Sequence, residues 1–340
     1  MTGNHIVGLD IGGANIKAAH LDGVTVSQPF PLWKEPDQLP FVLSEILNSL
    51  PPVDRLAVTM TGELADCYET KWEGVSSILD AVEIAAEGRQ VDVWQTGGEF
   101  VDAEFAVEFP LLVAAANWHA LATWVGQTNP SKQALLIDIG STTTDLIPIE
   151  NGLPATIGLT DVERLRSGEL VYAGVRRTPV MALAQEVPMG DGLIPLAAEQ
   201  FATTYDLYLL SGDLPESKQE TDTANGKPAT KAAAQDRLCR MLCCDRTEFP
   251  TEQLDSMAAW LREQHLQRMQ KALQQILNRC DKPISSVYLS GEGCFLADRL
   301  ISAFPELKNA ERLWLDQLFT PALSTAACAY AVAQLAASHG

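Results

Sequence analysis

Two pairs of short apolar runs mark the hydrophobic pattern of the chain, and in each pair a glycine and small polar residues separate the runs. One pair covers residues 6–19 and the other covers residues 135–149. Apolar runs of this length predict buried strands, and the polar turn between them predicts a hairpin. Leu-Asp-Ile-Gly-Gly in the first pair matches Ile-Asp-Ile-Gly-Ser about 128 residues later, which indicates an internal duplication.

Elsewhere the pattern alternates between strand and helix periods, which is typical of an α/β fold. Short strands are predicted over residues 56–60, 91–94 and 287–289. Helices are predicted over residues 38–50, 74–87, 111–122, 254–280, 296–304 and 320–337. Residues 126–132 are expected to form a linker. Residues 211–231 are rich in Gly, Asp, Ser, Thr, Lys and Pro, and they predict a loop that either covers a site or is merely flexible.

Chain length and charge limit the domain organisation and the kinds of partner that we expect. The chain has 340 residues, which is long for one core, so we expect two domains. Its 24 basic and 44 acidic residues give a formal charge of −20, which argues against a nucleic-acid or anionic-membrane partner. A phosphate ligand would therefore need local N–H groups, a few cations and a metal. The chain shows neither a leader-like N-terminus nor an apolar run long enough for a membrane span, and we expect a cytoplasmic protein.

The seven cysteines are an odd number, and three of them cluster at Cys239, Cys243 and Cys244. A structural zinc site usually needs a second pair of cysteines or histidines at a short spacing, and none accompanies this cluster. We therefore expect reduced, mostly buried thiols.

The turn of each hairpin can hold an anion. Gly140 lets the backbone approach a phosphate, the hydroxyl residues after it can donate hydrogen bonds, and Asp138 can hold a magnesium ion through water. The alternative is an ordinary hairpin with a solvated Ser/Thr face. The second copy of the pattern at Asp10 favours the phosphate interpretation.

Other polar residues are weaker candidates. Glu63 and Asp66 would share one face if a helix begins there, either to abstract a proton or only to complement the helix dipole. Asn117 and His119 interrupt a helix of small residues, where a histidine is more often structural than catalytic. Arg164 and the Arg176–Arg177 pair would either clamp a phosphate or carboxylate, or pair with nearby acids.

Three segments in order resemble the phosphate-1, phosphate-2 and adenosine motifs of the actin, hexokinase and Hsp70-type ATPase superfamily: the Asp10 hairpin, the Asp138 hairpin and Ser290-Gly291-Glu292-Gly293. The resemblance implies two ribonuclease H-like domains with an interdomain phosphate-binding cleft. The N-terminal domain would comprise residues 1–127 and 321–340, including a returning C-terminal helix. The C-terminal domain, with insertions, would comprise residues 128–320.

A closer resemblance joins several segments: residues 8–15, 59–67, 116–120, 137–145, 168–174 and 177–179. They resemble the hydantoinase/oxoprolinase-related family of tetrahydromethanopterin-linked one-carbon transfer. This resemblance implies a transferase of methanofuran biosynthesis that joins an aminomethylfuran diphosphate to a tyramine-type phenol and releases diphosphate. The alternatives are an ATP-dependent kinase, a hydantoinase-like hydrolase and, in another class, a nucleotide-sensing actin-like module.

Under this resemblance Asp10 and Asp138 would position Mg²⁺. The residues expected to bind diphosphate or a nucleotide are Gly12, Gly13, Asn15, Lys17, Gly140, Ser141, Thr142, Thr143, Thr144, Gly291 and Gly293. Glu63 or Asp66 would take the phenol proton, and Asn117, His119, Arg164 and Arg177 would bind substrate. Glu292 stands at a small-residue position of the adenosine motif, which argues against ATP as the ligand. The sequence leaves open whether the protein is a monomer or a homodimer.

Overall fold

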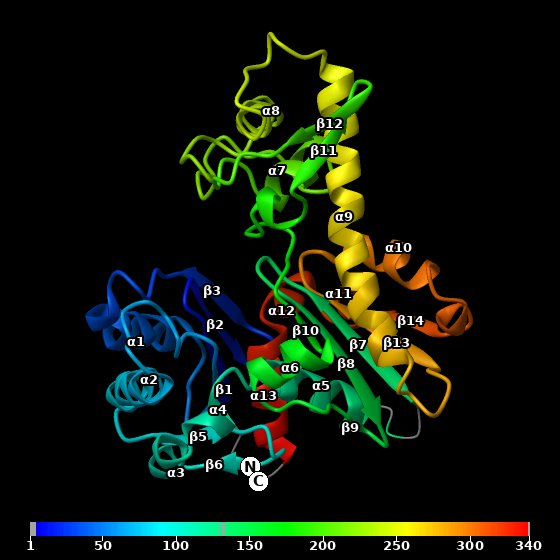
Figure 1. The fold of residues 1–340 in the computed structure, drawn as a ribbon. Helices are drawn as coiled ribbons and strands as arrows, with labels where there is room; N and C mark the ends of the chain where they lie inside the picture. Colours follow the sequence, from blue (N-terminus) through cyan, green and yellow to red (C-terminus); the bar gives the residue numbers. More distant parts are fainter. Residues whose placement is uncertain (1–4, 129, 131–132, 339–340) are drawn as a thin grey trace.

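The computed structural model describes residues 5–128, 130 and 133–338, and its first sheet contains six strands in the order β3-β2-β1-β4-β5-β6 (Figure 1). The strands β1, β2 and β3 form an antiparallel meander, β4 and β5 run parallel to β1, and β6 is an antiparallel edge. Their bounds are β1 (Ile6–Ile11), β2 (Asn15–His20), β3 (Thr25–Pro29), β4 (Arg55–Met60), β5 (Gln90–Trp94) and β6 (Phe100–Val101).

The second sheet repeats this arrangement, in the order β10-β8-β7-β13-β14. Here β7, β8 and β10 are antiparallel neighbours, β13 and β14 run parallel to β7, and β9 pairs with β8. The bounds are β7 (Ala134–Ile139), β8 (Thr144–Glu150), β9 (Leu153–Pro154), β10 (Leu170–Val171), β13 (Ser286–Ser290) and β14 (Glu311–Trp314). Three antiparallel strands followed by two parallel ones is the ribonuclease H-like topology. The predicted α/β fold with two such sheets is therefore confirmed.

Two helices lie between the sheets. They are α5 (Asn117–Thr128) and α13 (Ala327–Ser338), whose apolar side chains pack on strands of both sheets. Their small residues permit a close approach. A β-carbon at Gly8 of β1 would lie 1.8 Å from the carbonyl oxygen of Ala329, so only glycine fits where α13 crosses this strand.

The remaining helices cover the outer faces. Apolar side chains of α1 and α2 pack on the first sheet, and those of α9 and α10 pack on the second. The bounds of these and the other helices are α1 (Leu39–Ser49), α2 (Lys71–Ala86), α3 (Ala103–Glu108), α4 (Pro110–Val113), α6 (Asp161–Ser167), α9 (Thr251–Leu277), α10 (Ala297–Ser302), α11 (Leu315–Leu318) and α12 (Pro321–Thr325). Short 3-10 turns occur at Pro36–Gln38, Val180–Ala182, Cys294–Leu296 and Pro305–Leu307.

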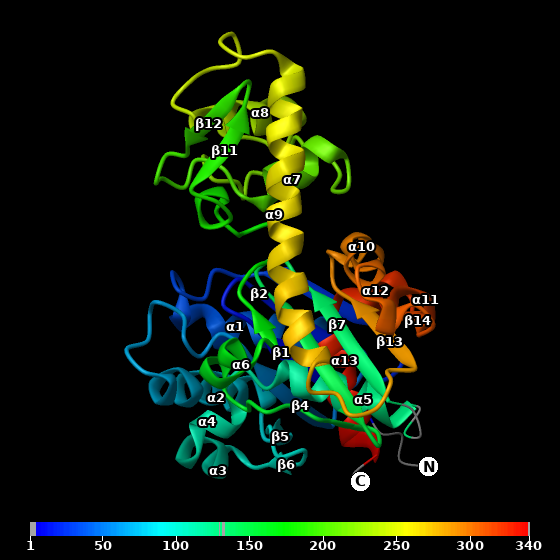
Figure 2. The same ribbon diagram turned by 45° about the vertical axis from the view of Figure 1, so that its right-hand side comes forward.

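A small lobe projects beyond the sheets, and α9 connects it to the rest of the molecule (Figures 1 and 2). It contains β11 (Glu186–Met189), β12 (Gly192–Pro195), α7 (Thr204–Ser211), α8 (Lys231–Arg240) and the first half of α9, with an apolar core of its own. Inside it the guanidinium of Arg237 pairs with Asp206 at 2.7 Å, and both side chains are buried. The sequence did not predict this separately packed unit, whose apolar core joins residues between 180 and 261.

Several predicted elements differ in detail. The helix expected over residues 111–122 is two pieces, α4 and α5, because Ala115 adopts a left-handed backbone with φ +50° that ends the first. The final helix is likewise divided at Ala326. The expected linker 126–132 begins as helix up to Thr128, and residues 129, 131 and 132 lie outside the described residues. The domain boundaries at 127/128 and 320/321 stay predictions. None of the described helices is long and apolar enough to cross a membrane.

Candidate active site

The two predicted hairpins place one aspartate each at the end of the central strand of each sheet. Asp10 lies opposite Lys17 across β1 and β2, and Asp138 lies opposite Asp145 across β7 and β8. The ammonium of Lys17 lowers the pKa of both Asp10 and Asp138, and the charge of Asp10 raises the pKa of Asp138. Coupling of this kind requires charged groups that lie close together, so the two hairpins contribute to one site.

The turn of the second hairpin is held by its carbonyl oxygens. The N–H of Gly140 donates to the carbonyl of Thr143 at 2.8 Å, and the carbonyl of Ser141 accepts the N–H groups of Arg176 and Arg177 at 3.0 Å. No acceptor among the described residues contacts the N–H of Ser141 or Thr142. The turn therefore offers donors, as the phosphate interpretation requires.

The turn of the first hairpin is held in a similar way. The N–H of Gly12 donates to the carbonyl of Asn15 at 3.0 Å, and Leu32 donates to the carbonyl of Gly13. A β-carbon at Gly12 would lie 2.9 Å from the Asn15 carbonyl oxygen, whereas one at Gly13 would meet nothing within 4 Å. Packing therefore requires glycine at position 12, and the space beside Gly13 leaves its backbone accessible to a ligand.

Asp10 is 8% exposed, and its Oδ1 has no hydrogen-bond partner among the described residues. Burial raises the pKa of Asp10, while Lys17 and a hydrogen bond from the Asn117 side chain lower it. Asn117 is the first residue of α5, so the sequence candidate Asn117 does reach the site. An orphaned carboxylate oxygen is the kind of ligand that a hard cation prefers.

The pKa of Asp138 is strongly raised. Burial and then the neighbouring Asp145 raise its pKa from 3.8 to about 6, against the opposing effects of Lys17 and a hydrogen bond from Ser290. Asp145 was not among the sequence candidates. The position of Asp145 at the end of the Ser/Thr run could have identified it, because a hairpin with this turn places it opposite Asp138.

Arg164 joins the second hairpin to helix α5. Its buried guanidinium pairs with Asp145, lies 3.6 Å from Asp161, and stacks 4.0 Å from the ring centre of Trp118. The alternative in which Arg164 pairs with nearby acids is thus observed. His119 is held by Trp94, whose Nε1–H donates to Nδ1 at 3.2 Å, and burial lowers the pKa of His119 to about 4. A neutral, hydrogen-bonded ring agrees with the structural interpretation of His119.

Glu63 lies in a second ionic group, which links the segment after β4 to α2 and α6. The Nζ of Lys71 lies 3.6 Å from Glu63 and 3.7 Å from Asp161 of α6. A β-carbon at Gly74 would lie 1.9 Å from the Glu63 carbonyl oxygen, so glycine lets the first turn of α2 approach. Burial raises the pKa of Glu63, and its Oε2 has no partner in the described part of the chain. Sequence reasoning missed Lys71 and Asp161, because nothing local indicates a contact 90 residues apart.

Asp66 does not join Glu63. Residues 61–70 contain no helix, so the expectation that a helix places both carboxylates on one face is wrong, and Asp66 is exposed. The pattern was misleading because Gly62 and the turn after it let the chain reverse before α2 begins at Lys71.

The turn at residues 290–293 packs tightly against β7. A β-carbon at Gly291 would lie 2.3 Å from the Ile139 carbonyl oxygen, and one at Gly293 would lie 2.3 Å from the Ile139 side chain. Arg176 forms a bidentate ion pair with Glu292 and stacks 4.3 Å from the Tyr205 ring centre. Arg177 is exposed and forms no ion pair with another described residue.

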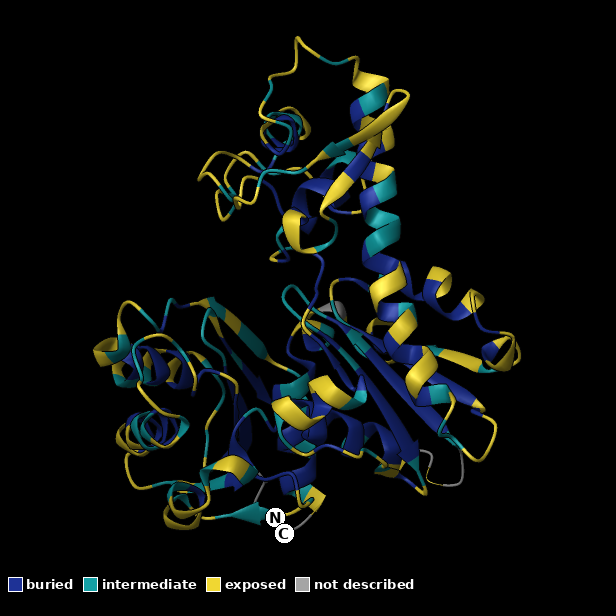
Figure 3. Cartoon of the chain, in the orientation of Figure 1, coloured by how far each residue is buried: buried dark blue, intermediate teal, exposed yellow. Residues whose placement is uncertain are grey.

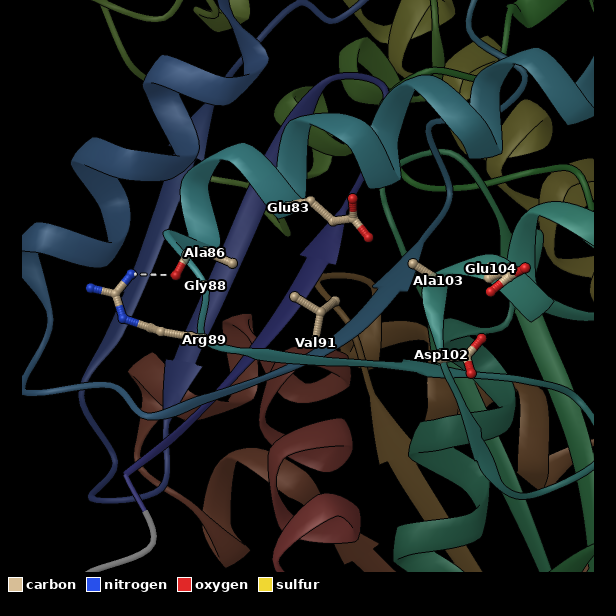
Figure 4. Close-up of a pocket in the computed structure, with 8 residues that line it drawn as sticks. All are labelled: Glu83, Ala86, Gly88, Arg89, Val91, Asp102, Ala103 and Glu104. Carbon is tan, nitrogen blue, oxygen red and sulfur yellow. Dashed lines mark hydrogen bonds between the residues drawn. The ribbon is translucent and has the colours of Figure 1, made fainter.

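The pocket in Figure 4 lies elsewhere, where the end of α2, β5 and the start of α3 meet. Its volume is about 530 Å³, and Arg89 is its one basic residue beside three acids. It contains none of the candidate residues. Within the described ranges no group of three or more His, Cys, Asp or Glu side chains could hold a metal ion.

Comparison with known proteins places the chain in a family. A family model described as hydantoinase/oxoprolinase matches residues 54–338. The chain belongs to the hydantoinase/oxoprolinase family. A relative from Methanocaldococcus jannaschii, named (4-{4-[2-(gamma-L-glutamylamino)ethyl]phenoxymethyl}furan-2-yl)methanamine synthase, is 36% identical over 291 residues, which are 85% of this chain and 86% of that relative. A protein of the same name from Methanococcus vannielii is 37% identical over 137 residues, which are 40% of this chain and 61% of that relative.

Solved structures with a similar fold are more distant. Component A of the (R)-2-hydroxyglutaryl-CoA dehydratase of Acidaminococcus fermentans is 11% identical with a TM-score of 0.47, and each chain is covered to 99%. The activator of the 2-hydroxyisocaproyl-CoA dehydratase of Clostridium difficile is 14% identical with a TM-score of 0.42, over 98% of this chain and 97% of that one. Structural similarity at such low sequence identity and TM-score is not evidence for a function.

Proposed function

We propose that this hydantoinase/oxoprolinase family member is a transferase of methanofuran-type coenzyme biosynthesis. It joins the phenol oxygen of a tyramine-type acceptor to the furfuryl carbon of an aminomethylfuran diphosphate. The observation that carries the proposal is the 36% identity, over 85% of the chain, to a synthase whose printed product contains a phenoxymethyl ether on a furan-2-yl methanamine. One carbon–oxygen bond forms, the bond from the same carbon to diphosphate breaks, and the phenol proton passes to a base.

The hairpin turns suit the leaving diphosphate. The N–H groups of Ser141 and Thr142 and the open backbone at Gly13 provide donors and space, and Lys17 supplies positive charge between Asp10 and Asp138. Donors that are already in place stabilise the charge that develops on a leaving group without reorganisation. Asn15 and Thr143 are the other turn residues proposed for this role. The expected contact from Thr144 is wrong, because this residue is buried and its hydroxyl donates to the carbonyl of Ala173 at 2.8 Å. Gly12 and Gly140 shape the turns, since their N–H groups donate to Asn15 and Thr143.

The donor set also fits Mg²⁺. The unpartnered Oδ1 of buried Asp10 and the half-buried Asp138 are the residues that would hold it. When bound, Mg²⁺ would neutralise part of the charge on the departing diphosphate. Asn117 orients Asp10 by its hydrogen bond.

Glu63 is the base in this proposal. It is buried with one free oxygen and a raised pKa, whereas Asp66 is exposed to solvent. A carboxylate with a raised pKa is a stronger proton acceptor once it is ionised. Lys71 holds the other oxygen of Glu63, at 3.6 Å, and so orients the carboxylate.

A diphosphate carried by the substrate fits this site better than ATP. Glu292 is engaged by Arg176, and the glycines on either side of it are packed against β7, so the turn offers no free carboxylate and little room beside its glycines for a nucleoside. For the acceptor, Arg177 is the exposed arginine that remains to bind its carboxylates, since Arg164 is already paired with Asp145.

The test is a reaction with purified protein, the aminomethylfuran diphosphate, γ-glutamyltyramine and Mg²⁺, followed by mass spectrometry of the ether and an assay of released diphosphate. The ether should form without ATP. Asp138→Asn should abolish it, whereas Asp80→Asn, at an exposed position of α2, should not. Product that forms only with ATP, or unchanged turnover in Asp138→Asn, would refute the proposal.

A further inference from the structure

The outward face of α6 is apolar although it meets solvent. Val162 is 67% exposed, and Leu165, Ile157 and Leu159 are also exposed. These four residues, which we call the α6 patch, lie within nine positions of the chain. Figure 3 shows that most of this helix has the exposed colour. Single exposed apolar residues are normal on a protein surface, but a cluster marks an interaction site.

Local hydrogen bonds tie the loop that carries Ile157 and Leu159 to α6. The N–H groups of Leu159 and Thr160 donate to Oε2 of Glu163 at 3.1 and 3.0 Å, which folds the preceding loop onto the first turn of α6. Val162 and Leu165 are three residues apart and so are neighbours on the helix surface. The patch is therefore already formed before any partner binds.

Two exposed charges flank these apolar side chains on α6, and they are of opposite sign. Glu163 is fixed by the bonds to Oε2, while Arg166 forms no ion pair with any described residue. The face therefore carries no net exposed charge on a chain whose formal charge is −20. Two copies of so acidic a chain repel one another overall, so a contact between them is opposed least at a face without net charge.

We propose that the α6 patch is the contact between two copies of this chain. In a two-fold arrangement the helices run antiparallel, so that Glu163 of each copy faces Arg166 of the other while Val162 and Leu165 pack near the axis. A two-fold interface must be self-complementary, and a helix with one acid and one base three residues apart meets this requirement. No other partner is needed to account for the pattern of charges.

The contact would also bear on the candidate site, because the opposite face of the same helix carries Asp161 and Arg164. These side chains reach Lys71 and Asp145. A second copy would cover the outer face of α6. The inner face of α6 would still position the ionic groups of the site. The proposal itself is independent of which reaction the site catalyses.

Sedimentation equilibrium of the full chain tests the proposal. The wild type should show twice the chain mass of 36.9 kDa. Val162→Glu should weaken the dimer at least about 100-fold, because the change occurs twice in a two-fold interface. Ile84→Glu is the matched control, since Ile84 is an equally exposed (64%) apolar residue on α2, and it should leave the dissociation constant unchanged.

Arg166→Glu gives a second, purely electrostatic arm, because it would place two carboxylates opposite each other in each half of the interface. This variant should also yield monomers. Their circular dichroism spectrum and melting temperature should equal those of the wild-type chain in its monomeric form. A wild type that is monomeric at about 100 μM chain would overturn the proposal. A dimer that survives both Val162→Glu and Arg166→Glu would overturn it as well, since the contact would then lie elsewhere.

Discussion

Replacing Arg164 by leucine should destabilise the protein strongly, because the guanidinium is the buried partner of Asp145. The Arg164 side chain is 2% exposed, and it also stacks on Trp118. Removing one member of a buried ion pair leaves an uncompensated charge and costs about 3–5 kcal/mol. At about 2 °C per kcal/mol for a chain of this size, the melting temperature should fall by about 6–10 °C.

The matched control is Arg299→Leu. Arg299 pairs with Glu263 at 2.8 Å, but its side chain is 53% exposed. Surface pairs of this kind contribute about 0–1 kcal/mol, so this variant should melt within about 2 °C of the wild type. Urea unfolding followed by tryptophan fluorescence gives the free energies of both variants.

The loss in Arg164→Leu should depend on pH. Burial raises the pKa of Asp145 above 3.8 and Arg164 lowers it, so the variant raises this pKa further. A carboxyl whose folded-state pKa is raised destabilises the fold as pH rises from its unfolded value through its folded value. The deficit should therefore be smallest in acid and largest at neutral pH, and Asp145→Asn in the same chain should recover most of it. A loss that is independent of pH, or no larger than that of Arg299→Leu, would refute this account of Arg164.

Three further outcomes follow from the site. Gly8→Ala should prevent folding or lower the melting temperature severely, because its β-carbon would meet Ala329, whereas Gly13→Ala should melt like the wild type but lose turnover; equal melting of the two would contradict the packing argument. In the metal-free protein the carboxyl of Asp138 should titrate near pH 6, as followed by infrared spectroscopy, and Asp145→Asn should lower this pKa since a neighbouring negative charge is removed; a pKa that stays in place would exclude this coupling. Glu63→Gln should reduce kcat by about 100-fold or more, as expected for loss of a general base, and Asp66→Asn should not; the reverse result would exchange their roles.

The fold was predictable because its signal is local. Each hairpin is formed by about 15 consecutive residues. The repeat of Asp-Ile-Gly at Asp10 and Asp138 therefore identified two similar halves from the sequence alone. The break at Ala115 was not predictable, because an alanine in the left-handed region is imposed by the packing around it. The projecting lobe was missed for a similar reason, since its core joins residues from 180 to 261.

The site was predictable only as far as its hairpins. Asp10, Asp138 and Lys17 do come together, as the two motifs require. The ionic group of Glu63, Lys71 and Asp161 depends on how α2 and α6 pack against each other. The sequence pattern of neither helix predicts this contact. Arg164 was expected to bind substrate, because in a chain with few cations every arginine is a candidate for binding an anionic ligand. In the structure its neighbours are instead carboxylates of the protein itself.

An oxygen label tests the central claim most directly. In the proposed transfer the phenol oxygen of the acceptor attacks the furfuryl carbon, so that the ether keeps this oxygen. With γ-glutamyltyramine labelled with ¹⁸O at the phenol, mass spectrometry should find the label in the ether and none in the released diphosphate. Label in phosphate or diphosphate, or an ether without it, would contradict the account.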